Sequence, residues 1–250
     1  MRDDIPGAAN AFGTAAGDYE RARPSYPAEV IELLRREVGI GPGARVCDLA
    51  AGTGKLTRLL VSTGATVIAV EPVPGMRDQL RSTTPEVEVL DGTAEAMPVE
   101  DAFLDAVTVA QAFHWFRFEE ALAEIRRVLR PGGGLAILFN ERDARTPWVQ
   151  HWNAAIEWHS RLIARYQDTD WTALLEGAGF ADVGRFDIEW KQPMTRELVA
   201  ARVRSVSYIA EEPAAVQQDY VDRVLALVDG VEEPFDLPYV THLWWCTKRS

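Results

Sequence analysis

The feature that most constrains this chain is the stretch from Val46 to Lys55, Val-Cys-Asp-Leu-Ala-Ala-Gly-Thr-Gly-Lys. An apolar strand, a glycine-rich turn and the start of a helix follow one another here, and a second apolar strand at 66–70 precedes Glu71. Glycine lets a ligand approach the backbone because no Cβ stands in the way. A carboxylate at the end of the next strand is placed to accept hydrogen bonds from ribose hydroxyls. The pattern predicts a site for a nucleoside-bearing cofactor at the carboxyl edge of a parallel sheet.

The glycine spacing discriminates between cofactors. A dinucleotide-binding turn has Gly-x-Gly-x-x-Gly/Ala, whose last small residue lets the helix pack closely on the strand. Here Gly52 and Gly54 are followed by Thr57 at that position, so the fit is poor. The segment resembles instead motif I of the class I methyltransferases that use S-adenosylmethionine, usually Asp-x-Gly-x-Gly-x-Gly. It departs from that motif at Ala50. The alternative interpretation is a strand-to-helix turn that has a packing role and binds no ligand.

Three further segments extend the resemblance over roughly residues 40–190. Residues 90–98, Leu-Asp-Gly-Thr-Ala-Glu-Ala-Met-Pro, resemble the segment after the family's third strand, often Gly-Asp-Ala-Glu-x-Leu-Pro. Residues 103–110 have the pattern of a fourth strand. Residues 125–134 resemble the family's Arg-x-Leu-x-Pro-Gly-Gly turn, in which Pro and Gly end a helix before a fifth strand at 135–139.

The resemblance implies S-adenosylmethionine as cofactor and S-adenosylhomocysteine as product. Glu71 would bind the ribose hydroxyls, and Thr93 and Ala94 would meet the adenine, with a hydroxyl in place of the family's usual Asp. Met76 would cover the adenine, or alternatively pack inside its own helix. The expected cofactor-binding residues are Tyr19, Arg23, Asp48, Ala50, Gly52, Gly54, Glu71, Met76, Thr93, Ala94 and Gln111.

Strands alternate with helices through the first 140 residues, which is typical of βαβ units and a parallel sheet. The resemblance implies an α/β, Rossmann-like class I methyltransferase fold with a seven-stranded, mostly parallel sheet, an antiparallel last strand and helical cap insertions. We expect one domain over 1–250, with an N-terminal arm at 1–26, a cofactor-binding core at 40–145, and a helical cap with the last strands at 146–250. Helices are predicted at 28–38, 54–63, 74–83, 118–129, 147–165, 170–177, 195–209 and 213–228, and late strands at 182–190 and 237–247.

The segment 19–27, Tyr-Glu-Arg-Ala-Arg-Pro-Ser-Tyr-Pro, resembles the Tyr-x-x-x-Arg-Pro-x-Tyr-Pro opening of the trans-aconitate-type small-molecule subgroup. In that subgroup the arm folds over the cofactor. Tyr19 would therefore shield the site, and Arg23 would approach the methionyl carboxylate or an acidic substrate. A surface turn fixed by Pro24 and Pro27 is the alternative.

Methyl transfer from a sulfonium is an in-line displacement, and alignment of the reactants alone contributes about 7–11 kcal/mol to lowering the barrier. A dedicated catalytic residue is therefore not obligatory. His114, in the segment 111–116 after the fourth strand, is the candidate general base or orienting group. Packing among the neighbouring aromatic side chains is the alternative for His114.

The expected substrate-binding residues are His114, Trp115, Arg142, Trp148, Arg204 and Tyr208. Arg142 is placed to bind a carboxylate, and an ion pair with Glu141 or Asp143 is the alternative. The acceptor is unidentified: acids, phenols and amines all fit the resemblance, and carboxylate O-methylation is one hypothesis.

Composition narrows the function classes. A formal net charge of −12 argues against a general nucleic-acid binder, since phosphate neutralisation needs clustered Lys and Arg. Two cysteines and four dispersed histidines form neither a disulfide framework nor a metal-binding set. No apolar run resembles a signal peptide or a membrane span, so we expect a cytoplasmic protein with a small-molecule substrate and no nucleic-acid or membrane partner.

Two other functions remain open from the sequence. An NAD(P)-dependent oxidoreductase would use a similar sheet, but the glycine spacing and the lack of a Tyr-x-x-x-Lys pair disfavour it. A catalytically silent adenosyl-binding protein is the second alternative, against which His114, Trp115 and the helical cap argue.

Overall fold

The computed structural model describes residues 20, 23–157 and 169–249. Tyr19, expected to shield the cofactor, lies outside the described residues. The chain divides into two compact units. The sheet unit comprises Ser25–Asn140, Thr169–Ile188 and Thr241–Ser250, and the helical unit comprises Met1–Pro24, Glu141–Asp168 and Glu189–Val240.

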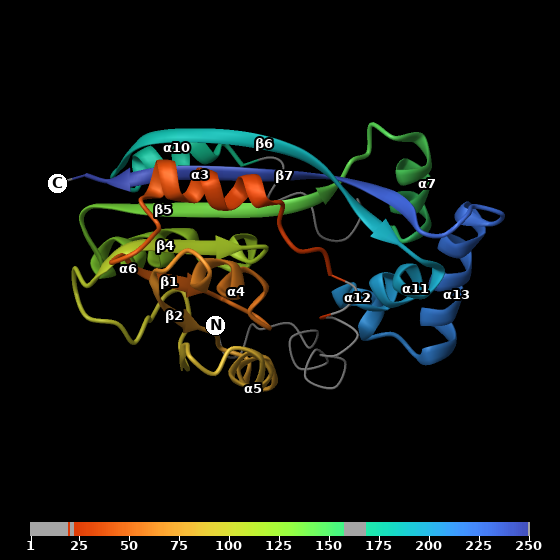
Figure 1. Ribbon diagram of the computed structural model, residues 1–250, viewed down its shortest axis with the longest axis horizontal. Helices are drawn as coiled ribbons and strands as arrows, with labels where there is room; N and C mark the ends of the chain where they lie inside the picture. The colour runs from red at the N-terminus through yellow and green to blue at the C-terminus, as the bar shows by residue number, and fades with distance from the viewer. Residues whose placement is uncertain (1–19, 21–22, 158–168, 250) are drawn as a thin grey trace. The chain divides into compact units, whose positions relative to one another are not determined.

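Seven strands of the described residues form one sheet, in the order β3-β2-β1-β4-β5-β7-β6. Neighbouring strands from β3 to β5 run parallel, and β7 runs opposite to β5 and β6 (Figure 1). The predicted mostly parallel sheet with an antiparallel last strand is therefore confirmed. The strands are β1 (Arg45–Leu49), β2 (Thr66–Val70), β3 (Glu88–Leu90), β4 (Leu104–Ala110), β5 (Leu129–Arg142), β6 (Phe180–Met194) and β7 (Phe235–Lys248).

Strand β1 lies at the centre of the parallel part of the sheet. Its residues 46–49 are all buried, as expected for a strand covered on both faces. Cys47 is in register with Ile68 of β2 on one side and with Val107 of β4 on the other. The strand order reverses between these two neighbours. The carboxyl end of β1 is therefore a topological switch point, where open α/β sheets bind ligands.

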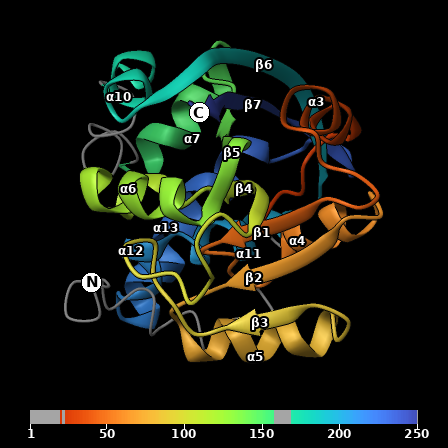
Figure 2. The ribbon, with the colours of Figure 1, turned by 90° about the vertical axis from the view of Figure 1, so that its left-hand side faces the viewer.

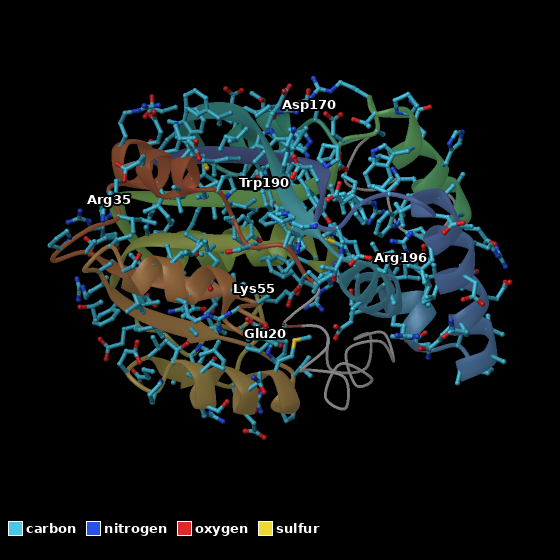
Figure 3. All side chains as sticks on the ribbon, turned by 45° about the vertical axis from the view of Figure 1, so that its right-hand side comes forward. Glu20, Arg35, Lys55, Asp170, Trp190 and Arg196 are labelled. Atoms are coloured by element: carbon cyan, nitrogen blue, oxygen red, sulfur yellow. The ribbon has the colours of Figure 1, made fainter. Side chains whose placement is uncertain are left out.

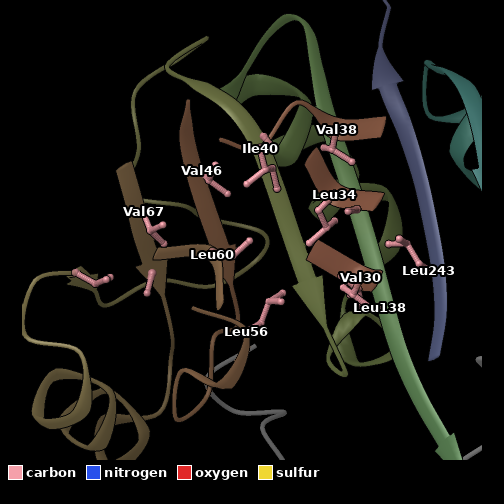
Figure 4. Packing of buried hydrophobic residues seen from close by; sticks show 14 of the residues in the cluster. Val30, Leu34, Val38, Ile40, Val46, Leu56, Leu60, Val67, Leu138 and Leu243 are labelled. Carbon is pink, nitrogen blue, oxygen red and sulfur yellow. The ribbon is translucent and has the colours of Figure 1, made fainter. Parts of the chain in front are cut away.

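Helices cover both faces of this sheet. Figure 2 shows α3 and α4 on one side and α6 and α10 on the other. Apolar residues of α3 recur three to four positions apart, and Leu34 packs with Leu60 of α4, Val46 of β1 and Leu138 of β5 in one buried cluster (Figure 4). The helices of the sheet unit are α3 (Ala28–Val38), α4 (Lys55–Val61), α5 (Pro74–Thr83), α6 (Phe118–Val128) and α10 (Trp171–Gly177).

The helical unit has a core of its own. Trp152, Val203, Val221 and Tyr239 are buried together in one apolar cluster. Arg196 begins α11 (Figure 3), and its guanidinium donates to the carbonyl oxygen of Val228 at 2.7 Å. The helices are α7 (Pro147–Ala155), α11 (Arg196–Arg204), α12 (Ser207–Ala210) and α13 (Ala214–Leu225).

Local structure departs from the sequence-based expectation at several places. The predicted helix at 147–165 is too long, because α7 ends at Ala155 and Glu157 has φ of 53°. The predicted single helix at 195–209 is wrong, because α11 ends at Arg204 and α12 begins two residues after Ser205. The Ser205 hydroxyl donates to the carbonyl oxygen of Arg202 at 2.8 Å, and Val206 is extended with ψ 128°, so the helix is interrupted. Strand β5 is longer than the predicted 135–139.

Candidate functional site

The glycine turn between β1 and α4 is built from residues with positive φ. Gly52 and Gly54 have φ of 58° and 86°, and Ala50 has φ of 55°. Only glycine adopts this region without strain, which explains the two glycines and marks Ala50 as strained. The N–H of Gly54 donates to the carbonyl oxygen of Ala51 at 3.0 Å and closes the turn before Lys55 begins α4 (Figure 3).

Glu71 joins the turn to the end of β2. Its Oε2 accepts a hydrogen bond from the N–H of Gly52 at 2.8 Å, and its Oε1 accepts one from the N–H of Val73 at 2.9 Å. Burial raises the pKa of Glu71, while these two bonds and the charge of Arg77 oppose the rise. Each carboxylate oxygen has two lone pairs, so these bonds leave further acceptor capacity. That capacity suits the two hydroxyls of a ribose.

Asp48 lies beneath the turn and is 1% exposed. Its Oδ2 accepts a hydrogen bond from the Thr57 hydroxyl at 2.6 Å, and its Oδ1 accepts one from the Thr108 hydroxyl at 3.2 Å. Burial raises the pKa of Asp48 to about 7 against the opposing effect of these hydroxyls. Asp48 therefore connects β1 to α4 and to β4, and so supports the turn from below.

Arg77 of α5 is a functional candidate that the sequence analysis did not identify. It is buried, and its Nη1 donates to the carbonyl oxygen of Glu71 at 2.8 Å and to Asp91 Oδ1 at 3.1 Å. Through these hydrogen bonds Arg77 connects α5 to the ends of β2 and β3. The preceding residue, Met76, lies beside the turn, because a Cβ built at Gly52 would be 3.8 Å from the Met76 sulfur. Arg77 lies six positions after Glu71 in the sequence, and no local sequence pattern predicts a contact between residues at that spacing.

The segment expected to meet an adenine folds back on itself. Thr93 and Ala96 exchange backbone hydrogen bonds of 3.3 and 3.2 Å, and Ala94 between them is 1% exposed. A Cβ at Gly92 would lie 2.5 Å from Pro98 Cδ and 2.9 Å from Val70 Cγ1. Glycine at position 92 therefore lets this segment approach the end of β2, next to Glu71.

The residues after β4 form a short 3-10 helix, η1 (Phe113–Trp115). Gln111 precedes it with φ of 62°, and its N–H donates to the carbonyl oxygen of Leu138 at 2.8 Å. The His114 ring lies 4.7 Å from the Trp115 ring and 5.8 Å from the Phe139 ring, measured between centroids. His114 is half-buried among these aromatic rings, whereas Trp115 is 42% exposed.

The other expected substrate residues belong to the helical unit. Arg142 is buried and its Nε donates to Asn153 Oδ1 at 2.8 Å, while Asp143 pairs with Arg145 at 2.8 Å. Arg204 donates to Gln218 Oε1 at 2.9 Å. Of the remaining two, Tyr208 donates its hydroxyl proton to the carbonyl oxygen of Ile156, and Trp148 lies 6.1 Å from the rings of Trp152 and Phe235. Arg23, expected to bind the cofactor, belongs to the same unit and donates to the carbonyl oxygen of Ser205 at 2.7 Å.

The sequence analysis missed Arg202, which is 4% exposed in the same unit. It lies two positions before Arg204 and therefore on a different side of α11. Charge alone does not distinguish the two arginines in the sequence, because only the packing of α11 decides which one is buried.

Metal-binding clusters and membrane-spanning helices are both absent from the described part of the chain. No three His, Cys, Asp or Glu side chains converge there as a metal site requires. No described helix has the length and apolar composition needed to cross a lipid bilayer.

The sheet-unit site has donor and acceptor groups of the kinds that bind an adenosyl group. The glycine turn presents backbone without side chains, and Glu71 presents a carboxylate with unused acceptor capacity. Ala94 and Met76, from the segments beside these polar groups, are buried apolar residues. Such a combination binds a sugar through its hydroxyls and a base through its face.

Comparison with known proteins finds methyltransferases among the proteins similar to this chain. A family model described as "Methyltransferase domain" matches residues 47–137. An uncharacterized methyltransferase of Mycobacterium tuberculosis is 41% identical over 237 residues, which is 92% of each chain.

Solved structures share the fold. A proposed methyltransferase from an antibiotic biosynthesis pathway of Anabaena variabilis superposes with a TM-score of 0.66 at 21% identity, covering 89% of this chain and 98% of that chain. An N-methyltransferase of Haemonchus contortus, solved in complex with S-adenosylhomocysteine, superposes with a TM-score of 0.54 at 15% identity, covering 89% of this chain and 52% of that chain.

Proposed function

Because this chain belongs to the class I S-adenosylmethionine-dependent methyltransferases, we propose that it transfers a methyl group from S-adenosylmethionine to a small-molecule acceptor. The observation that carries the proposal is the hydrogen bond from the Gly52 N–H to the Glu71 carboxylate. It holds the glycine turn next to the carboxylate that we propose to bind the ribose.

Each cofactor-binding role follows from the chemistry of the residue. The Glu71 carboxylate accepts hydrogen bonds from the ribose hydroxyls, and the Gly52 backbone permits close approach. Thr93 and Ala94 meet the adenine, and Met76 covers it. When bound, S-adenosylmethionine supplies an electrophilic methyl group on a sulfonium, whose neutral thioether is a good leaving group.

The residues after β4 are proposed to face the acceptor. His114 would orient the acceptor or remove a proton from it, since imidazole changes charge near neutral pH. Trp115 supplies an exposed aromatic face beside it, suited to excluding water from an apolar acceptor. Alignment of this kind contributes about 7–11 kcal/mol without covalent participation of the protein.

The acceptor is proposed to be a small molecule rather than a nucleic acid, in keeping with the net charge of −12. A carboxylate oxygen or another oxygen or nitrogen nucleophile would serve as the methylated atom. A cytoplasmic location stays a prediction.

Calorimetric titration tests the proposal. Wild type, Glu71→Ala and the control Glu88→Ala, which changes an exposed residue of β3, are titrated with S-adenosylmethionine, S-adenosylhomocysteine and NADH. Both adenosyl ligands should bind wild type and Glu88→Ala alike. Loss of the charge-assisted contact should weaken their binding to Glu71→Ala by about 1.5–3 kcal/mol. NADH should not bind.

Binding of NADH, or no binding of any nucleotide to the folded wild type, would overturn the proposal. A screen of acids, phenols and amines for acceptor-dependent formation of S-adenosylhomocysteine then separates an enzyme from a protein that only binds the cofactor.

A further inference from the structure

Glu95 connects the segment 93–96 to the beginning of α6. It directly follows Thr93 and Ala94, the residues expected to meet the adenine. Its Oε1 accepts a hydrogen bond from the backbone N–H of Arg117 at 3.0 Å, across 22 positions of sequence. Among the described residues, no hydrogen-bond donor contacts its buried Oε2. The bond to Arg117 therefore fixes the direction of this carboxylate.

This contact is made at the N-terminus of α6. Arg117 immediately precedes the helix and is extended, with φ −80° and ψ 97°. In a capping box, the side chain at the third helical position accepts a hydrogen bond from the N–H of the residue before the helix. Glu120 occupies that position, but it accepts from Nε of the Arg117 guanidinium instead, at 2.6 Å. Glu95 thus supplies the acceptor from another segment, at the helix end where the dipole favours negative charge.

Further contacts join the residue after this segment to α6 nearer its end. The Met97 N–H donates to Glu124 Oε1 at 2.8 Å, and Arg127 Nη2 donates to the Met97 carbonyl oxygen at 3.0 Å. Arg127 Nε also donates to Glu124 Oε2 at 2.8 Å, so the two side chains orient each other. The residues 93–97 are therefore attached to α6 both at its beginning and near its end.

The aromatic residues before α6 are packed against its first turn. Phe113 of η1 is buried, and its ring centroid lies 5.3 Å from that of Phe116 and 5.4 Å from that of Phe118 in α6. The N–H of Phe116 donates to the carbonyl oxygen of Phe113 at 3.0 Å. Close-packed interiors transmit strain. A shift at the beginning of α6 therefore also moves η1, which contains His114 and Trp115.

We propose that Glu95 is a positioning residue, which couples binding of the adenine to the placement of η1 beside the methyl acceptor. Its hydrogen bond to Arg117 transmits the position of the segment 93–96 to α6, and the packing of Phe113 transmits the position of α6 to η1. The inference rests on the proposed function, because Thr93 and Ala94 must meet the adenine for the link to act. Methyl transfer benefits from such a link, since it depends on alignment of donor and acceptor.

Two substitutions of Glu95 separate the reach of the side chain from its charge. Glu95→Asp keeps the negative charge, but its carboxylate is one methylene shorter and does not reach the Arg117 N–H. Glu95→Gln loses the charge and keeps a side-chain oxygen as acceptor. Glu119→Ala is the matched control, because it removes one negative charge from an exposed position in the first turn of α6.

A third substitution removes the same hydrogen bond from the donor side. Arg117→Pro lacks the backbone N–H, and the φ of −80° at this position suits proline. The preceding residue, Phe116, is extended with φ −79° and ψ 154°, as a residue before proline must be. Arg117→Met is its control, because it also loses the guanidinium but keeps the N–H.

Fluorine NMR of the full-length protein labelled with 5-fluorotryptophan tests the coupling. The sequence has eight tryptophans, so Trp115→Phe assigns the resonance of Trp115, which reports the environment of η1. Each protein is saturated with S-adenosylhomocysteine, and calorimetry confirms saturation. We expect the ligand to shift the Trp115 resonance of wild type, Glu95→Gln, Glu119→Ala and Arg117→Met. In Glu95→Asp and Arg117→Pro the shift should fall to less than half of the wild-type value.

Measurement at saturation separates coupling from a structural role. If Glu95 only stabilises the fold, Glu95→Asp and Arg117→Pro will have a lower Tm but an unchanged Trp115 shift, which would overturn the inference. Loss of the shift in Glu95→Gln or Glu119→Ala would also overturn it, because charge rather than the hydrogen bond would then be responsible. Wild type that binds S-adenosylhomocysteine without a Trp115 shift refutes the coupling alone. Wild type that does not bind S-adenosylhomocysteine refutes the proposed function, and the coupling with it.

Discussion

The carboxylate of Glu71 accepts a hydrogen bond from the backbone N–H of Gly52 across 2.8 Å. This bond joins the end of β2 to the glycine turn after β1, although 19 positions separate the two residues. The second carboxylate oxygen accepts a hydrogen bond from the N–H of Val73, so backbone donors orient both oxygens of the carboxylate. Preorganisation of this kind reduces the entropy lost on binding.

Arg77 supports that arrangement from α5. Arg77→Met leaves the carbonyl oxygen of Glu71 without its guanidinium donor and removes the ion pair with Asp91. We expect the free energy of unfolding to fall by roughly 1–3 kcal/mol and the affinity for S-adenosylhomocysteine to fall several-fold. Urea unfolding and calorimetry measure the two effects. Arg35→Met, which changes an exposed arginine of α3, should alter stability by less than about 0.5 kcal/mol. Equal behaviour of the two variants would contradict this role.

Ala50 has a strained backbone conformation in the glycine turn. At φ 55° an alanine costs about 1–2 kcal/mol that glycine avoids, while the more flexible unfolded state of a glycine variant takes back about 0.4–1 kcal/mol. Ala50→Gly should therefore raise the free energy of unfolding by up to about 1.6 kcal/mol.

The neighbouring residue Ala51 is the control for this prediction, since it is not among the described residues with positive φ. Ala51→Gly should lower stability by about 0.4–1 kcal/mol. Chemical denaturation measures both variants, and a loss of stability in Ala50→Gly would refute the strain.

The raised pKa of Asp48 predicts that the free energy of unfolding depends on pH. Its pKa is about 7 in the folded protein and near 3.8 ordinarily, so between these values the folded state holds a proton that the unfolded state has released. The contribution of Asp48 to the free energy of unfolding therefore falls as pH rises through this window. Asp48→Asn has no proton to lose. The stability of Asp48→Asn relative to wild type should rise from pH 4 to pH 7 and stay constant above it.

Urea unfolding from pH 4 to pH 8 measures this difference. Asp78→Asn changes an exposed carboxylate of α5 and should alter the free energy of unfolding little at any of these pH values. A difference between Asp48→Asn and wild type that is independent of pH would show that burial does not perturb the carboxyl.

The lack of a side chain at Gly92 lets the 93–96 segment lie close to β2. Gly92→Ala would place a Cβ 2.5 Å from the rigid ring of Pro98, so backbone must move. We expect a loss of roughly 1–3 kcal/mol in the free energy of unfolding and weaker binding of S-adenosylhomocysteine. Gly41→Ala is the control, because a Cβ there meets nothing within 4 Å. Equal stability of Gly92→Ala and Gly41→Ala would contradict the inference that the close packing at position 92 requires glycine.

The order of strands and helices, the glycine turn and the carboxylate after β2 could all be predicted from the amino-acid sequence. These features depend on short-range physics: the φ angles that glycine allows, and the periodicity of apolar residues along one element. The helices at 28–38 and 74–83 and the antiparallel last strand follow from the same signals and the family resemblance.

Which polar residues contact one another could not be predicted in this way, because those contacts depend on tertiary packing. Asp48 meets Thr108 across 60 positions, and Arg202 rather than Arg204 is buried with Arg142. The interruption of the predicted 195–209 helix at Ser205 belongs to the same group. In each case the outcome depends on how elements distant in the sequence pack, since packing chooses which face of a helix is buried and which charges lose their water.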